Sequence, residues 1–103
     1  MENINIEKVL KYFRAGKFEI AKKETAVLLK KFPNNYFLHN LFGAILIGQK
    51  KLDEAIIYFE KSINISPSYA DAYNNLAGVF LDQKKYDKAI KYFQKAIQIK
   101  PNL

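Results

Sequence analysis

The sequence contains no cysteine, and only three prolines and four glycines occur among its 103 residues. The absence of cysteine excludes disulfide bonds, thiolate metal sites and a thiol nucleophile. No apolar run approaches the ~20 residues that a membrane-spanning helix requires, and the first eight residues lack the basic start and long apolar stretch of a secretory signal. We therefore expect a cytoplasmic protein without a membrane partner. The scarcity of proline and glycine leaves most of the chain free to be helical.

Composition and charge narrow the class further. Of the residues, 50% are hydrophobic and 26% are charged, which argues against intrinsic disorder. A chain of this length can form one hydrophobic core, so we treat residues 1–103 as a single domain. The net charge of +7 raises nucleic acid, anionic lipid or acidic proteins as partners, but its meaning depends on where the charge lies.

The strongest signal is an internal 34-residue period, which separates Pro33 from Pro67 and Pro67 from Pro101. Other columns share the spacing: Ala21, Ala55 and Ala89; Lys17, Lys51 and Lys85; Phe18, Leu52 and Tyr86. Several independent columns with one period predict a repeat architecture, with repeats at residues 2–35, 36–69 and 70–103.

Within each period the apolar residues recur at steps of three and four, which is the spacing of one helix face. Ala55, Ile56, Phe59 and Ile63 follow this pattern. We expect six helices, at about residues 3–15, 18–31, 36–48, 52–65, 70–82 and 86–99. Because the connections are only a few residues long, neighbouring helices must be antiparallel.

Charged residues and prolines mark the ends of the second helix in each period. Asp53 and Asp87 stand at predicted helix starts, where a carboxylate can accept hydrogen bonds from free N–H groups and favours the positive end of the helix dipole. Each proline follows a predicted helix end, because proline cannot donate the next backbone hydrogen bond and disfavours a helical conformation in the preceding residue.

These columns resemble the tetratricopeptide repeat family, whose 34-residue signature is W-x2-L-G-x2-Y, then A-x3-F, then P. The third period reads Tyr73-x2-Leu76-Ala77-x2-Phe80, then Ala89-x3-Phe93 and Pro101. The second reads His39-x2-Phe42-Gly43-x2-Leu46, then Ala55-x3-Phe59 and Pro67. The first period, with Lys8, Val9 and Thr25 in these columns, is degenerate, as is usual at the end of a stacked array.

The resemblance implies an all-α fold, an α-solenoid of three antiparallel helix–turn–helix repeats wound into a right-handed superhelix. Small residues such as Gly43, Ala55, Ala77 and Ala89 would let paired helices approach closely. The first helices of the repeats would line a concave groove, and the second helices and turns would form the convex side. The implied function is a protein–protein interaction module, a scaffold or adaptor that binds a peptide or helix in this groove.

Helical periodicity and this implied geometry together predict the residues that face the groove. The predicted contact residues are Leu10, Phe13, Phe37, Asn40, Leu41, Ala44, Asp71, Asn74, Asn75 and Gly78, with Ile6, Arg14, Ile47, Leu81 and Asp82 beside them. Asparagine can pair with both N–H and C=O groups of an extended peptide, so these asparagines predict a sequence-tolerant grip. The alternative is that some of the apolar members are core between the helices.

Some members of the family clamp a C-terminal carboxylate with lysines and arginines in the groove. The corresponding columns hold Ile6, Leu10, Leu41, Asp71 and Asn75, so that clamp is absent from this sequence. An asparagine in the column of Asn75 resembles the backbone clamp of many members.

Nothing in the sequence indicates catalysis, a cofactor or a metal. The single histidine, His39, shares a column with Tyr73, and we interpret it as a packing residue rather than a general base. Helix starts explain Asp53 and Glu54 better than paired catalytic carboxylates do, and the four glycines are too isolated for a phosphate-binding loop.

The basic charge falls mostly outside the predicted groove. The predicted helices at 36–48 and 70–82 contain no lysine or arginine, whereas Lys50, Lys51, Lys84, Lys85, Lys88, Lys91 and Lys95 lie on the predicted convex side and edges. A solvated surface explains this placement. RNA binding by a helical-repeat array is an alternative function, but such arrays typically use a period of about 35 residues with a polar pair that reads each base. Nucleic acid is therefore the less favoured partner.

The last repeat presents an apolar face that no later repeat covers. Ile90, Ile97 and Ile99 would be partly uncovered, and apolar burial is worth ~25 cal/mol per Å², so this face favours association. Either the natural chain continues, or the ends stack or swap between copies. A homo-oligomer formed through this uncovered end is therefore the alternative to a module that binds a peptide of another protein.

Overall fold

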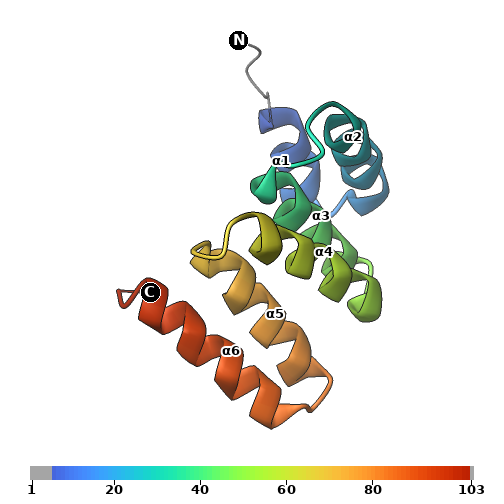
Figure 1. Cartoon of the computed structure of the whole chain (residues 1–103). Helices are drawn as coiled ribbons and strands as arrows, with labels where there is room; N and C mark the ends of the chain where they lie inside the picture. The colour runs from blue at the N-terminus through green and yellow to red at the C-terminus, as the bar shows by residue number, and fades with distance from the viewer. Residues whose placement is uncertain (1–5, 103) are drawn as a thin grey trace.

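The computed structural model describes residues 6–102 and arranges them as six α-helices (Figure 1). The helices are α1 (Glu7–Arg14), α2 (Phe18–Lys31), α3 (Tyr36–Gly48), α4 (Leu52–Ile65), α5 (Ala70–Asp82) and α6 (Tyr86–Ile99). The last five coincide with the predicted ranges. The first helix is shorter than predicted, because Ile6 and Ala15 flank it as its end residues, and residues 3–5 lie outside the described part of the chain.

The helices form three consecutive pairs, α1–α2, α3–α4 and α5–α6, which stack side by side (Figure 1). Between pairs, α3 packs on α2 and α5 packs on α4, so the first helix of each pair covers the second helix of the pair before it. The first helices α3 and α5 also contact each other. The predicted all-α solenoid of helix–turn–helix units is therefore confirmed.

The turn inside each pair has one backbone geometry. Gly16, Lys50 and Lys84, which share one column of the repeat, all have positive φ, at 73°, 61° and 61°. After each of them the next amide bonds a carbonyl five residues back, as Lys51 N does to Leu46 O at 2.9 Å. This is a Schellman ending, in which the left-handed residue directs the last amides back to orphan carbonyls of the helix. Only the first turn has the glycine that this conformation favours.

Asp53 and Asp87 lie at the starts of α4 and α6, as predicted, but neither caps its helix through a hydrogen bond. The residues before α4 and α6 are Lys51 and Lys85, and neither helix has a side-chain cap hydrogen bond. The two aspartates lie in the first turn, where they still favour the positive end of the helix dipole. The one side-chain cap among the described helices belongs to α3, where Asn35 Oδ1 accepts from Leu38 N at 3.0 Å.

The core consists of two apolar clusters along the stack. The larger one joins the second and third pairs through buried residues that include Phe42, Leu46, Phe59 and Leu76. The smaller one joins the first pair to α3 and contains Val9, Ala21, Leu41 and Ile45. Each pair therefore shares its core with the next, as expected for stacked repeats.

Small residues allow the paired helices to approach closely, as predicted. Ala55, Ala77 and Ala89 are fully buried or nearly so. A Cβ atom added at Gly43 would lie 2.7 Å from the ring of Phe59, whose side chain is completely buried. The missing side chain at Gly43 is therefore what admits the phenyl ring between α3 and α4.

His39 has the packing role that the sequence predicted. Its ring lies 9% exposed beside Tyr58, and Nε2 lies 2.7 Å from the carbonyl oxygen of Pro33. One period later, Tyr73 donates from its hydroxyl to the carbonyl oxygen of Pro67 at 2.9 Å. Both side chains thus tie the first helix of a pair to the turn that precedes it.

Candidate functional site

The side of the first helices that their neighbours leave open carries most of the residues predicted for the groove. On α5 the residues that are not buried are Asp71, Asn74, Asn75, Gly78, Leu81 and Asp82, and they share one face of the helix. The other two first helices have half-buried residues at the same positions of the repeat. These residues are Phe37 and Ala44 on α3, and Leu10 and Phe13 on α1. We call this surface the concave face.

In one column of the concave face, the side chains become smaller from α1 to α5. Leu10, Ala44 and Gly78 share one column of the repeat and occupy one position of their helices. A Cβ atom built on Gly78 would meet nothing within 4 Å. At Gly78 there is therefore open space directly above the backbone of α5.

The apolar residues predicted for the groove divide into surface and core. Leu10, Phe13 and Phe37 are half-buried and pack against the smaller core cluster, so part of each side chain remains at the surface. Phe13 also meets Phe18 edge to face, with ring centroids 5.9 Å apart. Leu41 is only 5% exposed and belongs to that cluster itself. Its burial corrects the prediction that it lines the groove.

Of the asparagines predicted for the groove, one is buried and another is exposed. Asn40 is 8% exposed, and its Oδ1 accepts from Asn75 Nδ2 at 3.0 Å, which links α3 to α5. Asn74, in the column of Asn40 one period later, is exposed. Asn40 is therefore a structural link rather than the free ligand contact that was predicted, and Asn74 is the more accessible amide for a peptide.

The side chain of Tyr69 lies close to those of Asn40 and Asp71, and both act on the pKa of its phenol. Burial, followed by the negative charge of Asp71, raises the pKa of Tyr69 to about 12. The phenol is thus held in its protonated form, and the exposed Asp71 carboxylate lies on the same face of α5 as Gly78.

Two aromatic residues at the border of the concave face were not predicted. Tyr36 and Tyr69 meet edge to face, with ring centroids 4.7 Å apart, and Tyr36 is exposed. Both precede or begin a first helix and lie outside the columns of the repeat signature. The sequence signal that could have predicted this contact is the tyrosine at the start of α3 and the tyrosine just before α5.

The charge of the concave face changes sign along the stack. Lys11 and Arg14 of α1 are exposed and border a shallow hollow with Glu7, Leu10 and Ala15. At the other end, Asp71 and Asp82 of α5 are exposed, and neither α3 nor α5 carries a lysine or arginine. The concave face is therefore acidic at α5 and basic at α1.

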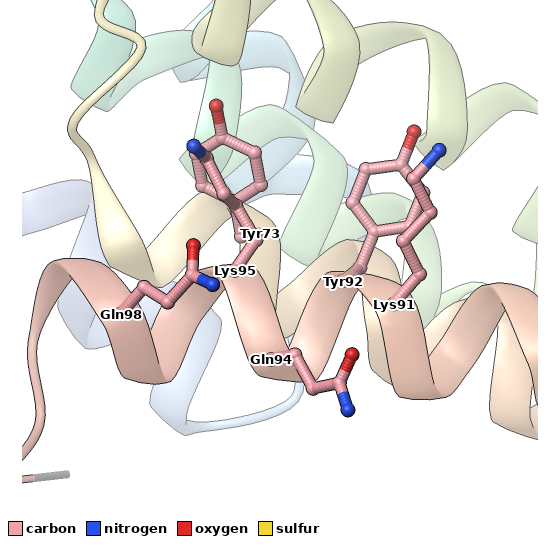
Figure 2. A pocket seen from close by; sticks show the side chains of 6 residues that line it. All are labelled: Tyr73, Lys91, Tyr92, Gln94, Lys95 and Gln98. Carbon is pink, nitrogen blue, oxygen red and sulfur yellow. The ribbon is translucent and has the colours of Figure 1, made fainter.

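A second hollow, of about 400 Å³, lies beside α6 (Figure 2). The rings of Tyr73 and Tyr92 stack there at 6.3 Å, and Lys91 and Lys95 extend alongside them. Both lysines are exposed, as are the other lysines predicted for the convex side and edges. The basic surface is therefore separate from the open end of the concave face.

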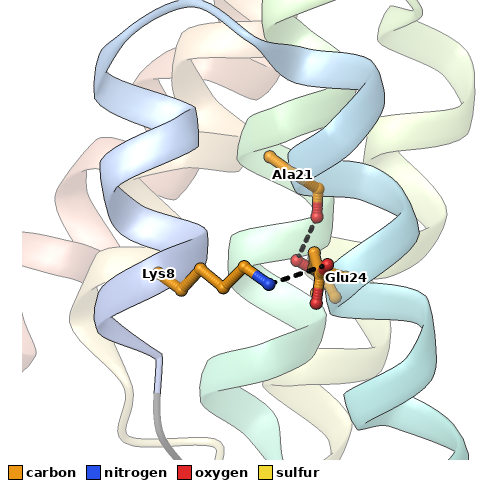
Figure 3. Close-up of polar contacts among 4 residues, drawn as sticks. Lys8, Ala21 and Glu24 are labelled. Atoms are coloured by element: carbon orange, nitrogen blue, oxygen red, sulfur yellow. Dashed lines mark hydrogen bonds and ion pairs between the residues drawn. The ribbon is translucent and has the colours of Figure 1, made fainter.

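The first pair carries polar groups where later pairs are apolar (Figure 3). Lys8 is exposed and pairs with Glu24 at 3.5 Å, in the column that Phe42 and Leu76 fill with buried side chains. Thr25 is fully buried, and its hydroxyl donates to the carbonyl oxygen of Ala21 at 2.7 Å. The degenerate columns of the first repeat are thus accommodated at an end of the stack.

The part of the chain that the structure describes offers no group of three or more histidines, cysteines, aspartates or glutamates that could hold a metal ion. None of the six described helices combines the length and apolar character needed to cross a membrane.

Comparison with known sequences identifies the repeat. Sequence models described as tetratricopeptide repeat match residues 38–69 and 70–103, which together are well over half of the chain. No curated protein sequence matches the chain significantly.

Comparison with solved structures identifies the same architecture. The first TPR of Spaghetti (RPAP3), bound to the HSP90 peptide SRMEEVD, has a TM-score of 0.89 at 24% identity, over 94% of this chain and 77% of that chain. MamA from Desulfovibrio magneticus RS-1 has a TM-score of 0.85 at 15% identity, over 92% and 54%. Another MamA structure has a TM-score of 0.84 at 21% identity, over 91% and 55%. The chain thus spans about half the length of MamA, and the TM-scores, at identities below 25%, show a shared fold alone.

Proposed function

Because the chain belongs to the tetratricopeptide repeat family, we propose that it is a protein-interaction module whose concave face binds a peptide or helix of a partner protein. The observation that carries the proposal is the open step at Gly78, with the exposed carboxylate of Asp71 and the exposed amide of Asn74 on the same face of α5. An apolar floor beside a few oriented polar groups is the usual composition of a ligand site. The solved structure of Spaghetti (RPAP3) with an HSP90 peptide shows that this architecture can hold a peptide.

The shape of the concave face sets the register of the ligand. A bulky side chain fits over Gly78, where the helix presents no Cβ atom, and fits less well over Ala44 or Leu10. Asn74 can donate to and accept from the ligand backbone. The ligand therefore has its largest apolar residue near α5.

The charge of the concave face sets the class of ligand. Asp71 and Asp82 favour a lysine or arginine next to the bulky residue, while Lys11 and Arg14 favour an acidic residue toward α1. Acidic ligand residues placed at α5 would bring like charges together. We expect this chain to bind a peptide with basic residues at that end instead.

A displayed peptide library selected on the full chain tests the proposal. We expect enrichment of peptides that combine a large apolar residue with a neighbouring lysine or arginine. Filling the open step with Gly78→Leu should weaken the selected peptides by at least about tenfold, because the substitution removes the space for the bulky side chain. Fluorescence anisotropy with a selected peptide measures the change.

Two further variants separate groove binding from other causes. Asp71→Asn with Asp82→Asn should weaken basic peptides and make their binding less sensitive to salt. Lys95→Ala, on the convex side, serves as the matched control and should leave affinity unchanged. Equal affinity of the selected peptides for the wild-type chain and for both groove variants would overturn the proposal.

A further inference from the structure

A groove lies between α4 and α6, above α5. It is a hollow of about 310 Å³, and the buried side chains of Leu76 and Phe80 form its floor. Ile56 and Glu60 of α4 form one wall, and Glu60 is the only acidic residue among those that line the hollow. Among the described helices, α4 and α6 make no extensive contact with each other, so the space between them stays open. We call this hollow the α6 groove.

Lysines form most of the opposite wall. Lys85, Lys88 and Lys91 are exposed and line the hollow. Lys88 Nζ lies 5.4 Å from the centre of the Phe80 ring, so its charge is placed over the apolar floor. Lys91 also lines the adjoining hollow shown in Figure 2. Within residues 6–102, no carboxylate forms an ion pair with any of these three lysines. The groove therefore combines an apolar floor with positive charge that no carboxylate of the described chain neutralises.

The repeat architecture does not require lysine at these positions. Ile20 of α2 shares the column of Lys88, and Ile57 of α4 shares the column of Lys91. These isoleucines are 44% and 51% exposed, so both columns lie at the surface elsewhere in the stack too. Among the three second helices, only α6 has lysine in both columns. The positive wall is therefore a property of the third pair and is not needed for stacking.

A further helix stacked on α6, as α5 is stacked on α4, would not occupy this groove. Such a helix would contact the side of α6 that carries the exposed Ile90 and Ile97. Ile90 follows Lys88 by two residues, which places its side chain about 200° away around the helix axis. Neither isoleucine lines the α6 groove. The groove would therefore stay open in a longer array, and its occupant is not another repeat.

The groove suits an acidic ligand that carries a large apolar side chain. Lys85 and Lys91 lie about 9 Å apart along the helix axis, a distance that about three residues of an extended chain cover. Carboxylates along such a segment can pair with the lysines, and an apolar side chain can fill the hollow against Ile56. Single-stranded nucleic acid is less suited, because its bases need open ring faces on which to stack. Phe80 is only 7% exposed, and Lys88 covers its ring.

A second copy of this chain does not supply such a segment. Asp53 and Glu54 are the only adjacent acidic residues in the sequence. The net charge of +7 also makes two copies repel each other. The ligand that matches the groove is therefore a different molecule.

We propose that the α6 groove binds an acidic segment of a partner protein, whose carboxylates pair with Lys85, Lys88 and Lys91 and whose apolar side chain enters the hollow. The apolar contact supplies affinity, and the lysines select for negative charge. This surface is separate from the concave face, so its occupancy is tested independently of the peptide site on the first helices.

Fluorescence anisotropy of a defined peptide with the full chain tests the proposal. The probe is a short labelled peptide of glutamates around one central phenylalanine. We expect saturable binding that weakens as the salt concentration rises, because exposed charges are screened. The double variant Lys88→Glu, Lys91→Glu should weaken binding by at least about tenfold, because two attractions become two repulsions.

The matched control makes the same change of charge on another second helix. Lys23 of α2 shares the column of Lys91, and Lys30 of the same helix is also exposed. The double variant Lys23→Glu, Lys30→Glu should change the affinity by less than about twofold, because these charges are far from the groove and screened by salt.

A second peptide tests the apolar part of the site. In this peptide the central phenylalanine is replaced by alanine, and the glutamates are unchanged. Its affinity for the wild-type chain should be lower by at least about fivefold, because the apolar contact in the hollow is lost.

The proposal fails on any of four results. The first is equal affinity of the phenylalanine peptide for the wild-type chain and for Lys88→Glu, Lys91→Glu. The second is an equal loss in the α2 control, which would assign binding to net charge alone. The third is equal affinity of the wild-type chain for the phenylalanine and alanine peptides. The fourth is tighter binding of a labelled single-stranded oligothymidine than of the phenylalanine peptide, which would assign the lysines to nucleic acid.

Discussion

Two glycines in the first helices have opposite surroundings. At Gly43 a methyl group would press on the buried ring of Phe59, whereas at Gly78 it would enter open space. Gly43→Ala should therefore lower the free energy of unfolding by about 1–2 kcal/mol, because overpacking outweighs the gain in helix propensity. Gly78→Ala should raise it by about 0.5–1 kcal/mol through that propensity alone. Urea unfolding measures both, and a stable Gly43→Ala variant would contradict the packing argument.

The left-handed residues in the turns are a second feature at this scale. Lys84 has a φ of 61°, a conformation that costs a residue with a Cβ atom about 1–2 kcal/mol. Lys84→Gly should raise the free energy of unfolding by about 0.5–1 kcal/mol, after allowance for the greater entropy of unfolded glycine. Lys85→Gly, at a φ of −94°, gains no such relief and should be destabilising. Thermal unfolding of the two variants should shift in opposite directions.

At the scale of the elements, Tyr69 lies just before α5 and packs edge to face on Tyr36 of α3. Its pKa is raised to about 12, mainly by burial, so the folded state holds the phenolic proton more tightly than the unfolded state, where the pKa is about 10. The stabilising contribution is fully present below pH ~10 and is lost as the pH rises from ~10 to ~12. Urea midpoints should fall across this window, and the fall should be smaller in Tyr69→Phe.

The matched control for this pH dependence is Tyr86→Phe. Tyr86 is exposed on α6 and takes no part in the contact with Asn40 and Asp71. Its variant should lose stability with rising pH as the wild-type chain does. A pH profile of Tyr69→Phe that matches the wild type would exclude Tyr69 as the titrating group.

The helices themselves were largely predictable from the sequence, because a 34-residue period with three prolines fixes where each pair starts and ends. The groove was less predictable. Periodicity places Asn40, Leu41, Asn74 and Asn75 on nearby faces, but only packing decides which are covered: α5 buries Asn40, and the core takes in Leu41. The hydrogen bond of Asp53 was not predicted, because its carboxylate accepts from Gln83, 30 residues away. Arguments about helix ends consider only residues that are close in the sequence.

For the whole molecule, the three pairs are expected to differ in local stability. The first pair has Lys8 and Thr25 in columns that the other pairs fill with leucine or phenylalanine. Of the buried residues of the smaller core cluster, Val9 and Ala21 come from this pair, and its other members there are only partly buried. Native-state hydrogen exchange should therefore show α1 opening first, with exchange at least about tenfold faster than in α3 or α5. Uniform protection across the three pairs would indicate that the chain opens as one cooperative unit.

The stacking order has a mechanical consequence. The principal contacts join helices that are neighbours in sequence, and α3 with α5 is the most distant of these pairs. The interfaces between pairs are therefore arranged in series between the two termini, and a force applied at the ends loads them one after another. Under tension we therefore expect the described part of the chain to lengthen in steps, as each pair detaches from the next.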